Sequence, residues 1–98
     1  MAQSPMQVIH NIDFKNQTVH TRHDPTIPAG GANIYNLPPT IPNGYELFSW
    51  SVQQVDAANG WCYHVFCPDE NYKLVVFNRY TSSVNQPYSV RYTYIKIT

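Results

Sequence analysis

The chain has 98 residues, enough for one domain, because a second core would leave each half too small to bury sufficient apolar surface. Six Lys and Arg balance six Asp and Glu, so there is no basic face for phosphates, and nucleic acid and anionic lipid are poor partners. Eight Tyr, eight Pro and only 12% charged residues are typical of strands, turns and a weakly charged surface, which suits self-association or a neutral sugar.

Short apolar stretches recur along the chain between Pro, Gly and Asn residues, and no window of useful length has helical spacing. The expected strands, in chain order, are Met6 to Phe14, Thr18 to Arg22, Ala32 to Asn36, Tyr45 to Gln53, Gly60 to Phe66, Tyr72 to Asn78 and Tyr88 to Ile97. This pattern predicts an all-β fold: a single small β-sandwich or jelly-roll-like barrel.

Alternation within these strands predicts which side chains face the core. In the strand from Tyr45 to Gln53, a period of two places Phe48, Trp50 and Val52 on one face, which we expect to be the core face. The opposite face then carries Tyr45, Leu47, Ser49 and Ser51.

The strands Tyr72 to Asn78 and Tyr88 to Ile97 are apolar on both faces. In the second, Tyr88, Val90, Tyr92 and Tyr94 share one face, and Ile95 and Ile97 lie on the other. A small domain must cover the second face of such a strand. We expect a subunit interface between copies of the chain to do so; the alternative is that the Pro-rich segment from Pro25 to Gly44 covers it within one chain.

The cysteines and histidines predict neither a metal site nor a cofactor. An extended segment points Cys62 and Cys67, five positions apart, to opposite faces, so we expect free thiols. Together with His64 they supply only three ligands, at a spacing that matches no zinc motif. A second cluster consists of His20, His23 and Asp24, interpreted as surface residues unless a trimer axis gathers one histidine in triplicate.

Catalytic motifs are not found, and we expect a binding protein rather than an enzyme. Glycoside hydrolysis needs two carboxylates across a cleft, and none of the acids stands in a recognisable setting: Asp13, Asp24, Glu46, Asp56, Asp69 and Glu70. The chain also has no phosphate-cradling Gly loop and no nucleophile beside an obvious base.

Sugar binding requires an exposed aromatic face and a few planar hydrogen-bonding groups. The segment from Asp56 to His64, which follows the strand Tyr45 to Gln53, offers both kinds of group. Trp61 comes directly after an Asn-Gly turn, so its indole lies near a strand end. The predicted ligand-binding residues are Asp56, Asn59, Trp61, Tyr63, His64 and Arg79, with Tyr80 beside them. The alternative is that Trp61 fills the core under a loop.

Several segments resemble the C-terminal head domains of receptor-binding proteins from tailed phages of Gram-positive bacteria. They are Pro25-Thr26-Ile27-Pro28-Ala29-Gly30-Gly31, Ile41-Pro42-Asn43-Gly44-Tyr45-Glu46-Leu47-Phe48-Ser49-Trp50, Asn59-Gly60-Trp61 and Tyr92-Thr93-Tyr94-Ile95-Lys96-Ile97. The resemblance implies a β-barrel or sandwich that forms a trimer in the phage tail of the virion and binds host cell-wall saccharide. The chain would then be made in the host cytoplasm and attached to the rest of the tail or baseplate.

The resemblance covers residues 18–98, which we expect to form the head, and leaves residues 1–17 as an N-terminal strand or the remnant of a stalk. No apolar run approaches the roughly 18 residues of a membrane helix, and the start has no signal-peptide pattern, so we expect a soluble chain. The rival interpretations are a structural trimerisation cap or fibre tip without a ligand, and a generic carbohydrate-binding module.

Overall fold

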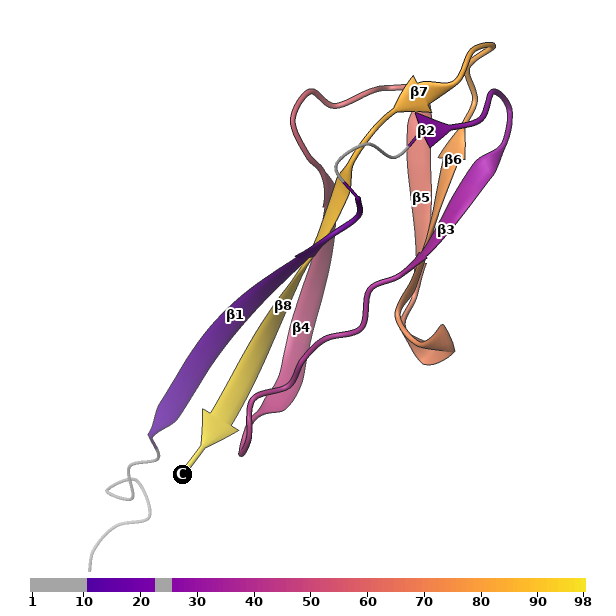
Figure 1. Cartoon of the computed structure of the whole chain (residues 1–98). Helices are drawn as coiled ribbons and strands as arrows, with labels where there is room; N and C mark the ends of the chain where they lie inside the picture. The colour runs from indigo at the N-terminus through magenta and orange to yellow at the C-terminus, as the bar shows by residue number, and fades with distance from the viewer. Residues whose placement is uncertain (1–10, 23–25) are drawn as a thin grey trace, which may run out of the picture.

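A computed structural model describes residues 11–22 and 26–98 of the chain. The fold is all-β, as the sequence predicts (Figure 1). Its elements, in order, are β1 (Ile12–His20), β2 (Thr26–Ile27), β3 (Ala32–Asn36), β4 (Glu46–Gln54), β5 (Cys62–Cys67), the 3-10 helix η2 (Pro68–Glu70), β6 (Lys73–Asn78), β7 (Val84–Asn85) and β8 (Tyr88–Ile97). In this part of the chain, no helix is long and apolar enough to cross a membrane.

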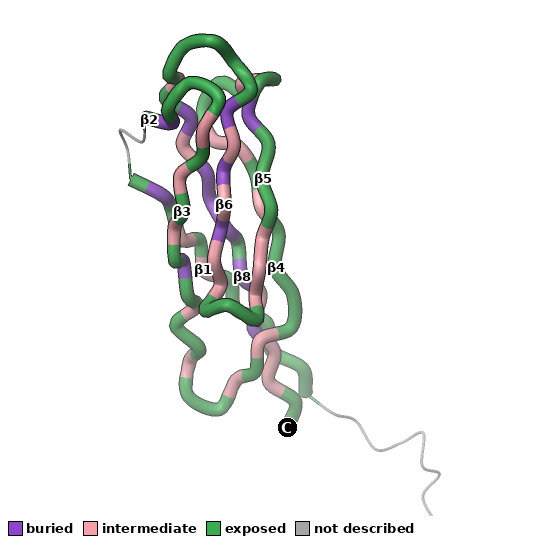
Figure 2. Tube along the Cα trace, turned by 90° about the vertical axis from the view of Figure 1, so that its right-hand side faces the viewer, coloured by how far each residue is buried: buried purple, intermediate pink, exposed green. Residues whose placement is uncertain are grey.

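Two three-stranded antiparallel sheets form the body of the molecule. The first has the order β1-β8-β4 and the second the order β3-β6-β5, while the short pair β2-β7 lies at one end (Figure 1). The long strand β8 is the centre of its sheet and β6 is the centre of the other. Figure 2 shows that the buried stretches concentrate on these two central strands.

The core lies between the two sheets. Tyr88, Val90 and Tyr92 of β8, which the sequence predicts to share one face, are fully buried and form the inner face of that strand. From the opposite sheet, Leu74 and Val76 of β6 are also fully buried. Large aromatic side chains bury more surface than aliphatic ones, so a Tyr-rich face gives a small domain the apolar burial that its length would otherwise limit.

The Pro-rich segment of residues 37–45 covers the part of β1-β8-β4 that the second sheet does not reach. The buried hydroxyl of Tyr92 donates a hydrogen bond to the carbonyl oxygen of Leu37. The backbone N–H of Thr40 donates to Oε1 of Gln17 at 3.0 Å. The segment therefore covers the inner face of this sheet, and the second, outer face of β8 stays open.

A β-bulge in β4 overturns the prediction that Phe48 faces the core. The register of β4 against β8 shifts between Leu47 and Ser49, so Phe48 occupies an extra position. Phe48 is 59% exposed and packs edge-on against Phe14 of β1, with 5.7 Å between ring centroids. Leu47, predicted for the opposite face, packs against the core instead. Trp50 faces the second sheet but stays 45% exposed, because β4 is an edge strand.

The first two predicted strands form one continuous strand, β1, which pairs with β8 from Ile12 to His20. The predicted break near Asn16 is wrong, because Asn16 pairs with Thr93 in the ladder and accepts a hydrogen bond from its hydroxyl at 2.9 Å. Asn11, which the prediction included, precedes the strand, and residues 6–10 of that predicted strand lie outside the described residues, as do His23 and Asp24 of the second ligand-type cluster. The pair β2-β7 was not predicted, since two residues are too few to show alternation.

Both sheets keep apolar side chains on their outer faces. Ile12, Phe14 and Ile97 on the first sheet are each more than half exposed. Ile34 on the second sheet is 63% exposed, and its partner Val75 lies next to it in the ladder. The described part of the chain thus leaves open the second faces that the sequence predicts to need cover. The homotrimer stays a prediction.

Candidate functional site

Three of the predicted ligand-binding residues lie together at one end of the β3-β6-β5 sheet. Trp61 precedes β5, Tyr63 lies at its start, and Arg79 follows the end of β6. The antiparallel register makes them neighbours, because Tyr63 pairs with Phe77 and the N–H of Arg79 donates to the carbonyl oxygen of Trp61 at 3.0 Å. Side chains two residues apart on a strand share a face, so the rings of Trp61 and Tyr63 both point outward.

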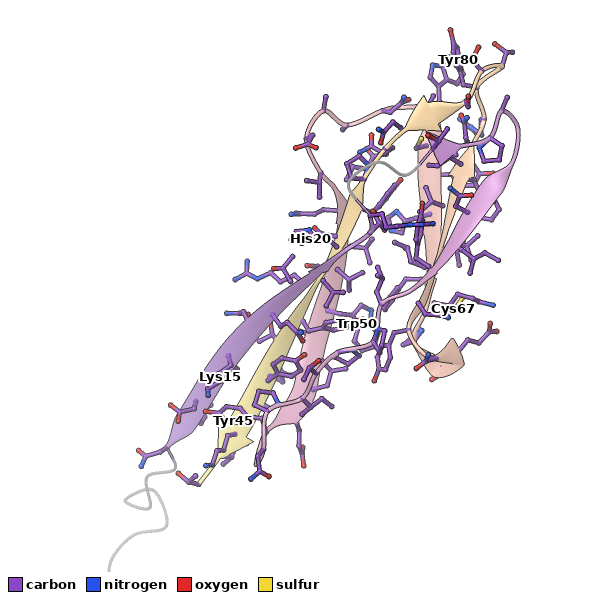
Figure 3. All side chains as sticks on the ribbon, viewed as in Figure 1. Lys15, His20, Tyr45, Trp50, Cys67 and Tyr80 are labelled. Atoms are coloured by element: carbon purple, nitrogen blue, oxygen red, sulfur yellow. The ribbon has the colours of Figure 1, made fainter. Side chains whose placement is uncertain are left out.

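Tyr80 completes an aromatic surface with these residues, which we call the platform: Trp61, Tyr63, Arg79 and Tyr80. The rings of Trp61 and Tyr80 lie 5.3 Å apart at 34°, and the guanidinium carbon of Arg79 lies 5.4 Å from the centre of the Tyr63 ring. Trp61 is 50% exposed, Tyr63 46% and Tyr80 41%, so Trp61 is not a core residue. Figure 3 shows Tyr80 at the end of the molecule opposite to Lys15 and Tyr45.

Asn59 positions Trp61 rather than joining the platform surface. Its side-chain Oδ1 accepts a hydrogen bond from the N–H of Trp61 at 2.9 Å, and its carbonyl oxygen accepts one from the N–H of Cys62 at 3.1 Å. Asn side chains commonly fix a turn by bonding the backbone two residues ahead. Asn59 therefore sets the path of the chain into β5 and the outward direction of the indole.

A buried amide, Asn78, holds the other side of the platform. The residue is 2% exposed, and its Nδ2 donates to the carbonyl oxygens of Ile27 at 3.1 Å and Ser82 at 2.9 Å. Its Oδ1 accepts from the N–H of Tyr80 at 2.8 Å. Because every polar atom of this side chain has a partner, it fixes β2, the loop after β6 and Tyr80 in one arrangement.

A second buried amide, Gln86, holds the loop that leads to Trp61. Its Oε1 accepts from the N–H of Asn59 at 2.8 Å, and its Nε2 donates to the carbonyl oxygen of Val55 at 3.0 Å. Neither Asn78 nor Gln86 was predicted as part of the site. A sequence shows the identity of an amide but not whether distant backbone groups converge on it, so no sequence signal could have found them.

His64 and Asp56 do not reach the platform. His64 points between the sheets, where its ring meets that of Tyr88 edge-on at 5.5 Å. Asp56 follows β4 with a positive φ of 65° and lines a separate hollow of about 170 Å³ together with His20, Thr21, Val55 and Pro87. The structure therefore separates the predicted ligand-binding residues into the platform, a positioning residue and two residues that lie elsewhere.

Burial raises the pKa of several ionisable groups in the core. Burial raises the pKa of the Tyr92 hydroxyl to about 12, with a smaller contribution from neighbouring Tyr72. Burial also raises the pKa of Tyr88, although a hydrogen bond from Gln54 opposes this shift. The same cause raises the pKa of the Cys62 thiol.

The cysteines point to opposite sides of β5, as predicted. Cys62 is buried on the inner face, Cys67 is half-buried on the outer face, and both thiols are free. Within residues 11–22 and 26–98, no three His, Cys, Asp or Glu side chains are grouped so that they could hold a metal ion. The acids Asp56 and Glu70 lie at opposite ends of β5, and Glu70 pairs with Lys73.

Comparison with known proteins identifies no relative: no family model, no curated protein and no solved structure matches the chain.

Proposed function

We propose that the chain is a non-catalytic binding domain whose platform holds a neutral saccharide. The observation that carries this proposal is the exposure of Trp61, which is 50% exposed although its backbone is fixed on both sides by hydrogen bonds. A large aromatic ring held open to solvent loses the free energy of burial, and a ligand that stacks on the ring recovers it.

The chemistry of the platform favours sugars over other ligands. Pyranose rings have an apolar face that stacks on Trp or Tyr, and hydroxyls that accept from a guanidinium such as that of Arg79. The platform itself contains no carboxylate, so it lacks the acid pair that would cleave a glycosidic bond. Its surface character also fits the low charge of the whole chain, 12% Asp, Glu, Lys and Arg.

An open platform gives weak affinity for one sugar, because only one side of the ligand is covered. Several copies on one particle raise the effective affinity by linking binding events. This is the setting that the resemblance to phage receptor-binding heads supplies: host adhesion through cell-wall saccharide by homotrimers at the phage tail. The generic alternative is a carbohydrate-binding module outside a virion.

A structural cap or fibre tip without a ligand is the second candidate. The apolar outer faces of both sheets favour it, because they suit contacts between subunits. The platform favours the binding function over the cap, since a cap gains nothing from an exposed Trp and Arg at the end of the sandwich.

The test uses the two Trp residues of the chain as a matched pair. We expect Trp61→Ala to weaken binding of Gram-positive cell-wall polysaccharide at least tenfold, equivalent to about 1.4 kcal/mol, measured by titration calorimetry. Trp50→Ala, at 45% exposure, is the control and should keep the affinity. In Trp50→Phe the remaining indole should change its fluorescence when polysaccharide is added.

Equal affinity of Trp61→Ala and the wild type, with both chains folded by circular dichroism, would contradict the platform as the binding site. A Trp61→Ala chain that melts far below the wild type would show instead that the indole supports the fold.

A further inference from the structure

We infer that a second copy of this chain packs against the outer face of the β1-β8-β4 sheet, at the end of the molecule opposite to the platform. The surface consists of Ile12, Phe14, Phe48, Ile95 and Ile97, and we call it the basal patch. The proposed function already includes association of several copies, and this inference deepens it by assigning the surface of contact; its test does not depend on saccharide binding.

The ladder of the sheet makes the basal patch continuous. Ile12 pairs with Ile97 and Phe14 pairs with Ile95, so four of its side chains lie side by side on β1 and β8. Phe48 reaches them from β4 and contacts Phe14 ring to ring at 5.7 Å. Phe14 is 55% exposed, Phe48 59% and Ile97 62%. Single exposed apolar residues are ordinary, but a contiguous group of this kind marks an interaction site.

The β-bulge in β4 is what places Phe48 in the basal patch. Without the register shift between Leu47 and Ser49, strand alternation would direct Phe48 inward with Trp50. The bulge interrupts the hydrogen-bonded ladder and moves an aromatic ring from the inner to the outer face. For an isolated chain in water, this change gives up the favourable free energy of burying the ring. That free energy is recovered only if another surface covers the ring.

The charges around the patch favour a like partner. Glu46 pairs with Ile95 on this outer face, and Arg91 lies on the same face further along β8. Neither side chain forms an ion pair with any residue that the structure describes. The ion pair found among these residues joins Lys73 and Glu70. One exposed acid and one exposed base beside the same apolar patch are self-complementary, since two copies can place unlike charges opposite each other.

The shape beside the patch also fits a copy of the chain. A hollow of about 230 Å³ lies between the start of β4 and the end of β8, lined by Gly44, Glu46, Ile95, Lys96 and Ile97. Phe14 pairs with Ile95, which lines the hollow, and Phe14 and its contact partner Phe48 are more than half exposed. A surface that has both projecting rings and an adjoining hollow can receive the rings of a second copy.

The position of the patch keeps the platform free. The two ends of the described chain meet beside the patch, where the N–H of Asn11 donates to Thr98 at 3.3 Å and the N–H of Thr98 donates back at 3.0 Å. The platform lies at the other end of the sandwich (Figures 1 and 3). Association through the patch therefore leaves each platform open and directs several of them away from the contact.

The test compares two isoleucines that are almost equally exposed on different sheets. Ile97 in the patch is 62% exposed, and Ile34 on the outer face of β3-β6-β5 is 63% exposed. We expect light scattering of the wild type to give a mass of two or more chains, and Ile97→Glu to give the mass of one. Ile34→Glu, the matched control, should keep the wild-type mass.

Phe14→Glu is a second variant on another strand of the patch and should also give single chains, with circular dichroism confirming that both variants fold. A wild type that is monomeric at all concentrations would overturn the inference, as would an Ile97→Glu or Phe14→Glu chain of unchanged mass. Dissociation by Ile34→Glu alone would assign the contact to the other sheet and overturn it equally.

The outcomes for saccharide binding are separate. If Ile97→Glu gives folded single chains that still bind one polysaccharide site per chain, the two proposals both hold. If Trp61→Ala leaves polysaccharide binding unchanged while Ile97→Glu lowers the mass, the proposed function fails and this inference stands.

Discussion

The two ends of the sandwich expose apolar side chains in different surroundings. At the platform, Trp61 and Tyr80 lie beside the Arg79 guanidinium, and buried amides such as Asn78 hold their backbone. At the basal patch, the exposed side chains are aliphatic or Phe, and the strand ladder and the contact between Phe14 and Phe48 hold them. Exposed aromatic area alone therefore does not define a ligand site, since both ends of the sandwich have it. Polar groups within reach and a fixed backbone distinguish a surface for a hydroxylated ligand from one for another apolar surface.

The largest expected effect at the platform end comes from Asn78→Ala. The substitution leaves the carbonyl oxygens of Ile27 and Ser82 without their donor and Tyr80 without its acceptor. Unpaired buried groups cost about 1–3 kcal/mol, so we expect the free energy of unfolding in urea to fall by about 2–3 kcal/mol. Asn36→Ala, on an exposed β3 position, is the control and should change it by less than about 0.5 kcal/mol.

Asn78→Ala should also weaken saccharide binding, because Tyr80 loses the contact that places it beside Trp61. A variant that is destabilised but binds polysaccharide with wild-type affinity would show that the network supports only the fold. A variant with an unchanged free energy of unfolding would show that the hydrogen bonds of Asn78 do not stabilise the platform end of the molecule.

Alkaline pH should lower the free energy of unfolding, because the core contains buried tyrosines. The pKa of Tyr92 is raised from 10.0 to about 12, so between these values the unfolded chain has lost the proton and the folded chain has kept it. Since the unfolded state then binds fewer protons, the stability is complete below pH 10 and falls above it, at about 1.4 kcal/mol per pH unit. Urea unfolding at pH 9, 10 and 11 measures this slope.

Tyr92→Phe removes one titrating group and should make the alkaline slope shallower than in the wild type. An identical slope in both chains would mean that the hydroxyl of Tyr92 does not contribute to it. Tyr88 and Tyr94, whose pKa values burial also raises, account for the slope that remains in the variant.

At neutral pH, Tyr92→Phe should have a smaller effect, confined to the basal end. The variant loses the hydrogen bond to the carbonyl oxygen of Leu37, which helps to hold residues 37–45 over the first sheet. We expect a loss of about 1 kcal/mol in unfolding free energy and faster amide hydrogen exchange at Thr40. Tyr45→Phe, whose hydroxyl makes no hydrogen bond with a described residue, is the matched control. Unchanged exchange at Thr40 in Tyr92→Phe would contradict the role of this bond.

Part of the candidate site could be predicted because it depends on local pattern. The alternation that places Trp61 and Tyr63 on one face is a property of any strand, and the Asn-Gly turn before Trp61 marks where β5 begins. Asp56 and His64 were grouped with them through closeness in sequence. The turn at Asp56 and the period of β5 direct these two side chains elsewhere, so nearness along the chain did not become nearness in space.

Periodicity and turn chemistry in short windows predicted the all-β class, most strands to within one or two residues, and the shared Tyr face of β8. Only the tertiary structure decided that Phe48 turns outward, that Asn78 and Gln86 hold the platform, and that the outer faces of both sheets stay open. These features depend on which distant backbone groups meet across strands. The buried amides bind partners far away in the sequence as well as near ones: Asn78 donates to Ile27, 51 positions away, and Gln86 to Val55, 31 positions away, and such contacts leave no local signal.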